Sequence, residues 1–175
     1  SIGGLLSQLR YLLGAKIPQH NQTLTTILDE LFDEVRNIGT DLYSPHLQKF
    51  SLAQLVEGYC QKYKKNNTIQ IQVENSGHPF AKSEQVKLHL FRIVQEAITN
   101  AIRHSKATQI LVQLIYTEAA LSIIIEDNGV GLPHHATPKG MGMDNMRNRA
   151  TFIGAELSID NLTPQGTCVQ VHWQW

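Results

Sequence analysis

Three polar side chains stand four residues apart in the stretch QEAITNAIRHSKA: Glu96, Asn100 and His104. Four residues along an α-helix correspond to about 400° of rotation, so a helix would place all three on one face. A carboxylate, an amide oxygen and the nearby cations Arg103 and Lys106 suit a hydrated Mg²⁺ with phosphates, because Mg²⁺ takes few protein oxygens. A solvated helix surface is the alternative, although asparagine is a poor residue for a helix interior and is expected there for a reason.

Glycines and one aspartate form a second group of candidate residues. EDNGVGLP follows an apolar run, and Gly129 and Gly131 can adopt backbone conformations closed to other residues and let a flat ligand approach closely. Asp127 stands at the expected end of a strand and could accept a hydrogen bond from an exocyclic amine; a plain Asp-Asn-Gly turn is the alternative. In KGMGMDNM, Gly140 and Gly142 stand just before a predicted helix, whose first amide groups favour an anion such as phosphate.

These glycines do not fit the common nucleotide-binding fingerprints. The third glycine of the dinucleotide-binding pattern is missing, because Asn145 stands in its place, and no Gly-Lys-Ser/Thr follows as in a P-loop. A further glycine-threonine pair, Gly166 and Thr167 in PQGTCV, opens the last predicted strand. Each of these three motifs is weak alone. Together with QEAITNAIRHSKA they make four motifs, and the order of the four along the chain is specific.

Composition excludes several classes of protein. The 175 residues suffice for one domain with a proper core, or for a domain with a short appendage. Fifteen Lys plus Arg balance fifteen Asp plus Glu, which argues against a non-specific nucleic-acid binder. No apolar run approaches the roughly 20 residues of a bilayer helix and the start lacks a signal pattern, so a cytoplasmic location is expected. Cys60 and Cys168 lack CxxC spacing and are expected to be buried thiols.

The first part of the chain has the spacing of a coiled coil. Apolar residues alternate at intervals of three and four from Ile2 to Leu12 and again from Leu24 to Leu42, with a break at KIPQHN. This pattern predicts an antiparallel helical hairpin within residues 1–46. Two helices alone cannot cover such a stripe, so a second copy is expected to complete a four-helix bundle; packing of the hairpin on its own domain is the alternative.

The pattern changes after the hairpin. Helices are predicted at Leu52–Tyr63, at Ser83–Ser105 and in a stretch ending near Ile153, and strands at TIQIQVEN, QILVQLIY, ALSIIIED, AELSID and TCVQVHW. Short turns join the second strand to the third and the fourth to the fifth, so both pairs are expected to be hairpins. Residues 47–175 are therefore predicted to form a two-layer α/β sandwich with a mixed sheet of about five strands.

In this order, the motifs resemble those of a known family. QEAITNAIRH, DNGVG, GMGM and GT resemble the N, G1, G2 and G3 boxes of the GHKL (Bergerat-fold) ATP-binding domain, and within it those of sensor histidine kinases of the nitrate-sensor-like subfamily. The Glu-x-x-Thr-Asn-x-x-Arg-His form of the N box is typical of that subfamily, as are the short lid at residues 132–139 and the lack of an F box. DEVRNIGTDLYSPHLQKFSLAQLVEGYCQKY resembles the second dimerisation helix, its proline-bearing break and the first helix of the ATP domain. The family more often has Arg-Pro-Pro where this chain has Ser-Pro-His.

The resemblance implies a role for each site residue. Asn100 would coordinate Mg²⁺, and Asp127 would bind the adenine amino group of ATP. Glu96 would either activate water, as in the related ATPases, or orient metal-bound water, as in kinases. The remaining residues would surround the ATP: Arg103 and His104 near the phosphates, Gly129 and Gly131 at the adenine, Gly140 and Gly142 where the lid crosses the phosphates, Met143 (more often leucine) in the same box, and Thr167 near the adenine.

The phosphoacceptor histidine of the family is missing from the first predicted helix. SIGGLLSQL resembles what directly follows that histidine and its acidic neighbour, and the nearest of the eight histidines, His20, lies in the hairpin turn. The chain is therefore expected to begin just past its phosphoacceptor. Phosphate would pass from Mg-ATP to that histidine and then to an aspartate of a response-regulator receiver domain, within a homodimer formed by the N-terminal helices. Whether the parent protein spans the membrane through an upstream sensor region stays open.

Rival functions stay open as well. A GHKL-type ATPase or a serine-directed anti-sigma kinase would use the same boxes, but the heptad hairpin speaks against both. A non-catalytic dimerisation module with a relic nucleotide pocket is a rival of another class, which the intact Asn100 and Asp127 disfavour. The adjacent His134 and His135 of the predicted lid lack a third ligand for a metal site.

Overall fold

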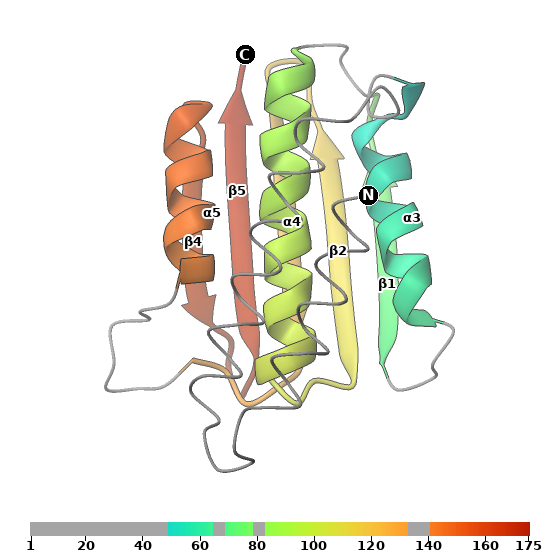
Figure 1. The fold of residues 1–175 in the computed structure, drawn as a ribbon, viewed down its shortest axis with the longest axis vertical. Coiled ribbons are helices and arrows are strands. Elements are labelled where there is room, and N and C mark those ends of the chain that lie inside the picture. Colours follow the sequence, from blue (N-terminus) through green and yellow to red (C-terminus); the bar gives the residue numbers. More distant parts are fainter. Residues whose placement is uncertain (1–48, 65–68, 79–82, 133–140) are drawn as a thin grey trace, which may run out of the picture. The chain divides into compact units, whose positions relative to one another are not determined.

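The computed structural model describes residues 49–64, 69–78, 83–132 and 141–175 (Figure 1). By its internal contacts the chain divides into two compact units, Ser1–His46 and Leu47–Trp175. The predicted helical hairpin, its dimerisation, Gly140 and most of the predicted lid lie outside the described residues. All elements discussed below belong to the second unit.

A five-stranded mixed sheet forms one layer of this unit (Figure 1). The first two strands pair in parallel, and the other neighbours pair antiparallel, in the order β1-β2-β3-β5-β4. Both predicted hairpins are present, as is the mixed sheet. The strands are β1 (Gln70–Ser76), β2 (Gln109–Tyr116), β3 (Ala120–Asp127), β4 (Glu156–Asn161) and β5 (Thr167–Gln174).

Three helices lie side by side over one face of the sheet: α3 (Leu52–Lys64), α4 (Glu84–His104) and α5 (Met141–Phe152) (Figure 1). The middle helix, α4, contacts both of the others. It therefore buries more than the single stripe expected of an amphipathic helix: Leu90, Ile93 and Ala97 are buried as well as Phe91, Val94, Ile98 and Ala101. The two-layer α/β prediction is confirmed.

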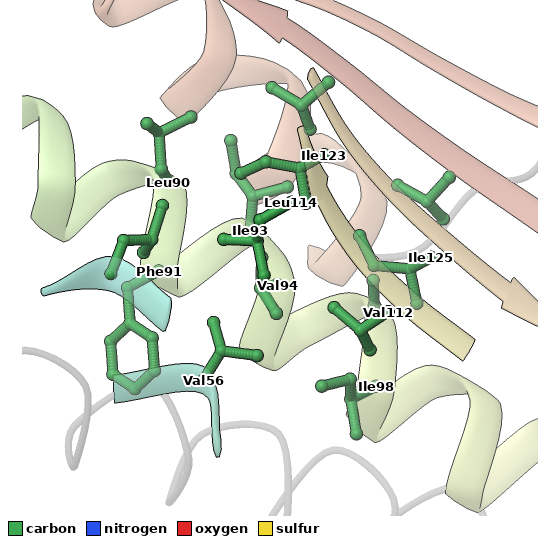
Figure 2. Close-up of a cluster of buried hydrophobic side chains, with 14 of the residues drawn as sticks. Val56, Leu90, Phe91, Ile93, Val94, Ile98, Val112, Leu114, Ile123 and Ile125 are labelled. Carbon is green, nitrogen blue, oxygen red and sulfur yellow. The ribbon is translucent and has the colours of Figure 1, made fainter. Parts of the chain in front are cut away.

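The core lies between the helices and the central strands (Figure 2). Branched side chains of β2 and β3 meet α4 there, because alternate residues of a strand share one face. Along β3 this period of two runs through Ile123 and Ile125 to Asp127, so the apolar row of the strand ends in a carboxylate on the helix side. The end of β3 thus places the Asp127 carboxyl group at the edge of the hydrophobic core.

Two smaller expectations concern the cysteines and the membrane. Cys60 and Cys168 are both buried thiols, as predicted. Burial raises the pKa of the Cys168 thiol, which favours the protonated form. Within the described part of the chain, no helix is long and apolar enough to cross a membrane.

Candidate functional site

The polar row of α4 meets the start of α5. Glu96 and Asn100 are half-buried, and a Cβ atom added at Gly142 would clash with the Glu96 carboxylate and lie 3.6 Å from Asn100 Nδ2. Because Gly142 has no side chain, the first turn of α5 can approach this row with its main-chain amide groups. A carboxylate, an amide and the positive end of a helix thus lie together at one place.

The prediction that Gly142 precedes the helix is wrong. The helix α5 begins at Met141, so Gly142 lies inside its first turn. Glycine is unfavourable in a helix interior, which is why the sequence pattern suggested a later start. The close approach to Glu96 supplies a reason for glycine at this position.

Asp127 closes β3 and is buried, with only 7% of its surface exposed. Its Oδ1 accepts a hydrogen bond from the main-chain N–H of Gly129 at 2.8 Å. Thr167, the first residue of β5, is the ladder partner of Asp127. The structure therefore brings together three residues that the sequence singled out: Asp127, Gly129 and Thr167.

The segment after Asp127 is fixed to the end of α4. The N–H of Val130 donates to the carbonyl of Ser105, the C-cap residue of α4, at 2.8 Å. The Asn128 Oδ1 accepts from the N–H groups of Thr108 and Gln109 at 2.9 and 3.0 Å. The last turn of α4 thus connects the two groups of candidate residues, and the rise from Asn100 to Ser105 is about 7.5 Å along the helix axis.

The two glycines of DNGVG are needed for different reasons. Gly131 has a φ of +77°, a conformation that favours glycine, as expected from the sequence. Gly129 is not among the residues with positive φ; instead, a Cβ atom there would clash with the main chain and side chain of Ser105. The reasoning from backbone freedom is therefore wrong for Gly129, which is required by close packing within the chain.

The remaining predicted site residues lie around these two groups. Arg103 and His104 are exposed on the last turn of α4. Met143 is half-buried and packs against the hydrophobic core, which accounts for an apolar residue at this position.

Several residues of the site were missed by sequence reasoning. Asn128, Ser105 and Asn161 bind main-chain groups of the segment or its neighbours, and the buried Gly166, with a φ of +109°, lies directly against the carbonyl oxygen of Asp127. Gly166 was already named from the sequence as part of the GT pair, but no role was predicted for it. The others act on residues far away in sequence, and only the fold shows them.

The donors near Gly142 fit Mg²⁺. The Asn100 amide and the Glu96 carboxylate offer hard oxygen atoms, which this ion prefers. Among the described residues, no group of three or more His, Cys, Asp and Glu side chains could hold a metal ion. An ion that takes its other ligands from phosphates and water does not need such a group.

Comparison with known proteins decides the family. Residues 85–175, which contain the polar row, Asp127 and all the described glycines of the site, match the histidine kinase-, DNA gyrase B-, and HSP90-like ATPases. The chain belongs to this ATPase family. The stretches that resemble the N, G1 and G3 boxes lie on α4, at and directly after the end of β3, and at the start of β5.

The relatives of this chain include bacterial sensor proteins. The chain is 31% identical over 160 residues to the sensor protein VraS of Staphylococcus saprophyticus, a match covering 91% of this chain and 46% of that protein. It is 26% identical over 152 residues to the oxygen sensor histidine kinase NreB of Staphylococcus carnosus, covering 86% of this chain and 44% of that protein. The chain thus spans less than half the length of these curated relatives.

The fold is also that of solved histidine kinases. The structure of the blue-light activated histidine kinase of Erythrobacter litoralis EL346 superposes with a TM-score of 0.65 at 19% identity, over 85% of this chain and 49% of that chain. At this identity the likeness shows the fold alone, an α/β sandwich with a five-stranded mixed sheet.

Proposed function

We propose that this chain is the catalytic part of a two-component sensor histidine kinase. It would bind Mg-ATP and transfer the γ-phosphate to a histidine upstream of Ser1, from which the phosphate passes to an aspartate of a response-regulator receiver domain. The observation that carries the proposal is the contact of Gly142 with Glu96 and Asn100. That contact joins a helix N-terminus, which favours phosphate, to oxygen donors that suit Mg²⁺.

Different residues of the site would bind different parts of the nucleotide. The buried Asp127 would accept a hydrogen bond from the adenine amino group, beside Gly129, Gly131 and Thr167. The first amide groups of α5 would bind the phosphates, with Arg103 and His104 at the end of α4 as the nearby basic groups. Asn100 would hold Mg²⁺, which when bound neutralises phosphate charge and stabilises the transferred group.

Phosphoryl transfer asks little covalent chemistry of the protein, because positioning and charge stabilisation supply most of the catalysis. The bond between the γ-phosphorus and the bridging oxygen breaks, a bond from a histidine nitrogen to phosphorus forms, and ADP leaves. We assign Glu96 an orienting role at the phosphate end, because a general base for water at that place would consume ATP without phosphorylating the histidine.

The partners follow from this function. We propose a homodimer through the helices within residues 1–46, a receiver domain as the acceptor of the phosphate, and a cytoplasmic location for this part of the protein. The relatives support this proposal, since they are named as sensor proteins and sensor histidine kinases.

Phosphorylation of a longer form tests the proposal. The chain is extended upstream of Ser1 by about ten residues of the parent gene, roughly three helical turns. It is then incubated with Mg-ATP labelled at the γ-phosphate. Label that is acid-labile and base-stable, and that is lost in Asp127→Ala, is expected. The Asn75→Ala variant, on the distant edge strand β1, should keep the label.

Other results of this experiment would count against the kinase. ATP turnover with no label on the protein would favour an ATPase in which Glu96 acts as a general base. Neither label nor nucleotide binding would leave a dimerisation module with a relic site.

A further inference from the structure

The last residue of β4 holds the segment that follows Asp127. The side-chain Oδ1 of Asn161 accepts a hydrogen bond from the N–H of Leu132 at 2.6 Å, and its Nδ2 donates to the carbonyl of the same residue at 3.2 Å. One amide side chain therefore pairs with both main-chain groups of one residue 29 positions away in sequence. Two such bonds fix the orientation of the main chain at Leu132 as well as its position.

Gly131 makes room for this contact. A Cβ atom added at Gly131 would lie 2.7 Å from the Asn161 Oδ1 and 3.1 Å from the carbonyl oxygen of Gly166. Glycine at this position thus serves two needs, its φ of +77° and the close passage of the Asn161 amide. The second glycine of DNGVG and Asn161 are complementary in shape.

The turn between β4 and β5 does not need the Asn161 side chain for its own closure. The N–H of Leu162 donates to the carbonyl of Gly166 at 2.9 Å and closes the turn through the main chain. Asn161 itself is exposed and adds nothing to the hydrophobic core. Its side-chain hydrogen bonds are made with Leu132, which points to a role in that segment.

The same turn holds the segment at a second point. Gln165 Nε2 donates to the carbonyl oxygen of Asn128 at 3.0 Å, and Gly166 lies directly against the carbonyl of Asp127. The chain from Asp127 to Leu132 is therefore held by this turn near both of its ends. Asn161 supplies the contact at the end farther from the sheet.

We propose that Asn161 is a positioning residue for nucleotide binding, whose paired hydrogen bonds to Leu132 hold the DNGVG segment in the conformation that receives the adenine. This inference rests on the proposed function, since it presupposes a nucleotide beside Asp127. It assigns to Asn161, the last residue of β4, a part in the site that none of the four boxes covers. The residue touches main chain, and through it the adenine-binding residues.

Calorimetric titration of the 175-residue chain with ADP and with Mg-ATP tests the proposal. Asn161→Ala removes both hydrogen bonds, and the loss of two such bonds from an exposed side chain, each at the low end of its usual net strength, corresponds to an affinity about fivefold weaker. Asn161→Asp keeps an acceptor for the Leu132 N–H but loses the donor, so its affinity should fall between those of Ala and the wild type. Asn75→Ala, an exposed asparagine on β1 at the other edge of the sheet, is the matched control and should bind as the wild type does.

Two features distinguish positioning from a merely structural role. The loss should be the same factor for ADP and Mg-ATP, because the contact lies in the segment assigned to adenine. The binding stoichiometry should stay at one nucleotide per chain, whereas partial unfolding would lower the stoichiometry and leave the affinity of the folded molecules unchanged.

Each outcome bears on one of the two proposals. Unchanged affinity in Asn161→Ala, or lowered stoichiometry at unchanged affinity, overturns the role of Asn161 while the proposed function stands. A wild-type chain that binds neither ADP nor Mg-ATP overturns the proposed function itself, and the role of Asn161 falls with it.

Discussion

The two ends of the sheet are held together by different interactions. At one end β3 finishes, β4 finishes and β5 begins, and the contacts there join asparagine side chains to main-chain groups, as at Asn128 and Asn161. The other end of the sheet carries the C-terminus (Figure 1), and two tryptophan side chains make contacts there. The rings of Trp173 and Trp175 lie 5.4 Å apart, and their Nε1–H groups donate to the carbonyls of Ile153 and Glu118 at 3.0 and 2.9 Å.

This difference leads us to expect different effects of substitutions at the two ends. Large aromatic rings bury apolar surface and tolerate small shifts, so the tryptophan end is suited to stabilising the sheet. At the Asp127 end, glycines let main-chain segments approach to distances that exclude a Cβ atom, and single amides set the positions of loops. We therefore expect substitutions at the Asp127 end to change ligand binding, and substitutions at the tryptophan end to change stability alone.

The largest effect is expected at Gly166. Its φ is +109°, and a Cβ atom there would clash with the main-chain carbonyl of Asp127. Because the clashing atoms belong to the main chain, they cannot shift without disturbing the end of β3. Gly166→Ala should lower the free energy of unfolding by about 3 to 5 kcal/mol and abolish nucleotide binding. Urea denaturation and calorimetric titration measure the two effects.

Gly154→Ala is the control for backbone strain without a clash. Gly154 also has a positive φ, +69°, but a Cβ atom there would meet nothing within 4 Å. The cost should be about 1 kcal/mol, with nucleotide affinity unchanged. Equal losses of stability in the two variants would show that the contact with Asp127 contributes nothing.

A smaller effect is expected at the tryptophan end. Trp173→Phe removes the hydrogen bond to Ile153 and part of the packed area, so the free energy of unfolding should fall by about 1 to 2 kcal/mol. Nucleotide affinity, measured well below the melting temperature, should stay the same. A weaker affinity in this variant would contradict the division between the two ends.

The sequence sufficed for the secondary structure and the layers of the ATPase domain. Strands such as ALSIIIED and the long helix before Ser105 have strong apolar periodicity. This periodicity places apolar side chains on the face that packs in the core, so it predicts the element directly. The candidate site residues Glu96, Asn100 and Asp127 could also be identified from the sequence, because their types are unusual for their places on a helix face and at a strand end.

The contacts that fix the site could not be predicted in the same way. The clash that requires glycine at Gly129 involves Ser105, and the bonds of Asn161 involve Leu132; both pairs meet only through the fold. Gly142 illustrates the same limit, since local propensity argues against glycine inside a helix while the contact with Glu96 on α4 requires it.

A crystal structure of the chain with Mg²⁺ and a non-hydrolysable ATP analogue would locate the nucleotide relative to both groups of candidate residues. We expect the adenine amino nitrogen about 3 Å from the Asp127 carboxylate, and the phosphates between the polar row of α4 and the first amide groups of α5. A nucleotide bound away from Asp127, or phosphates that do not reach Asn100 and the start of α5, would contradict this expectation.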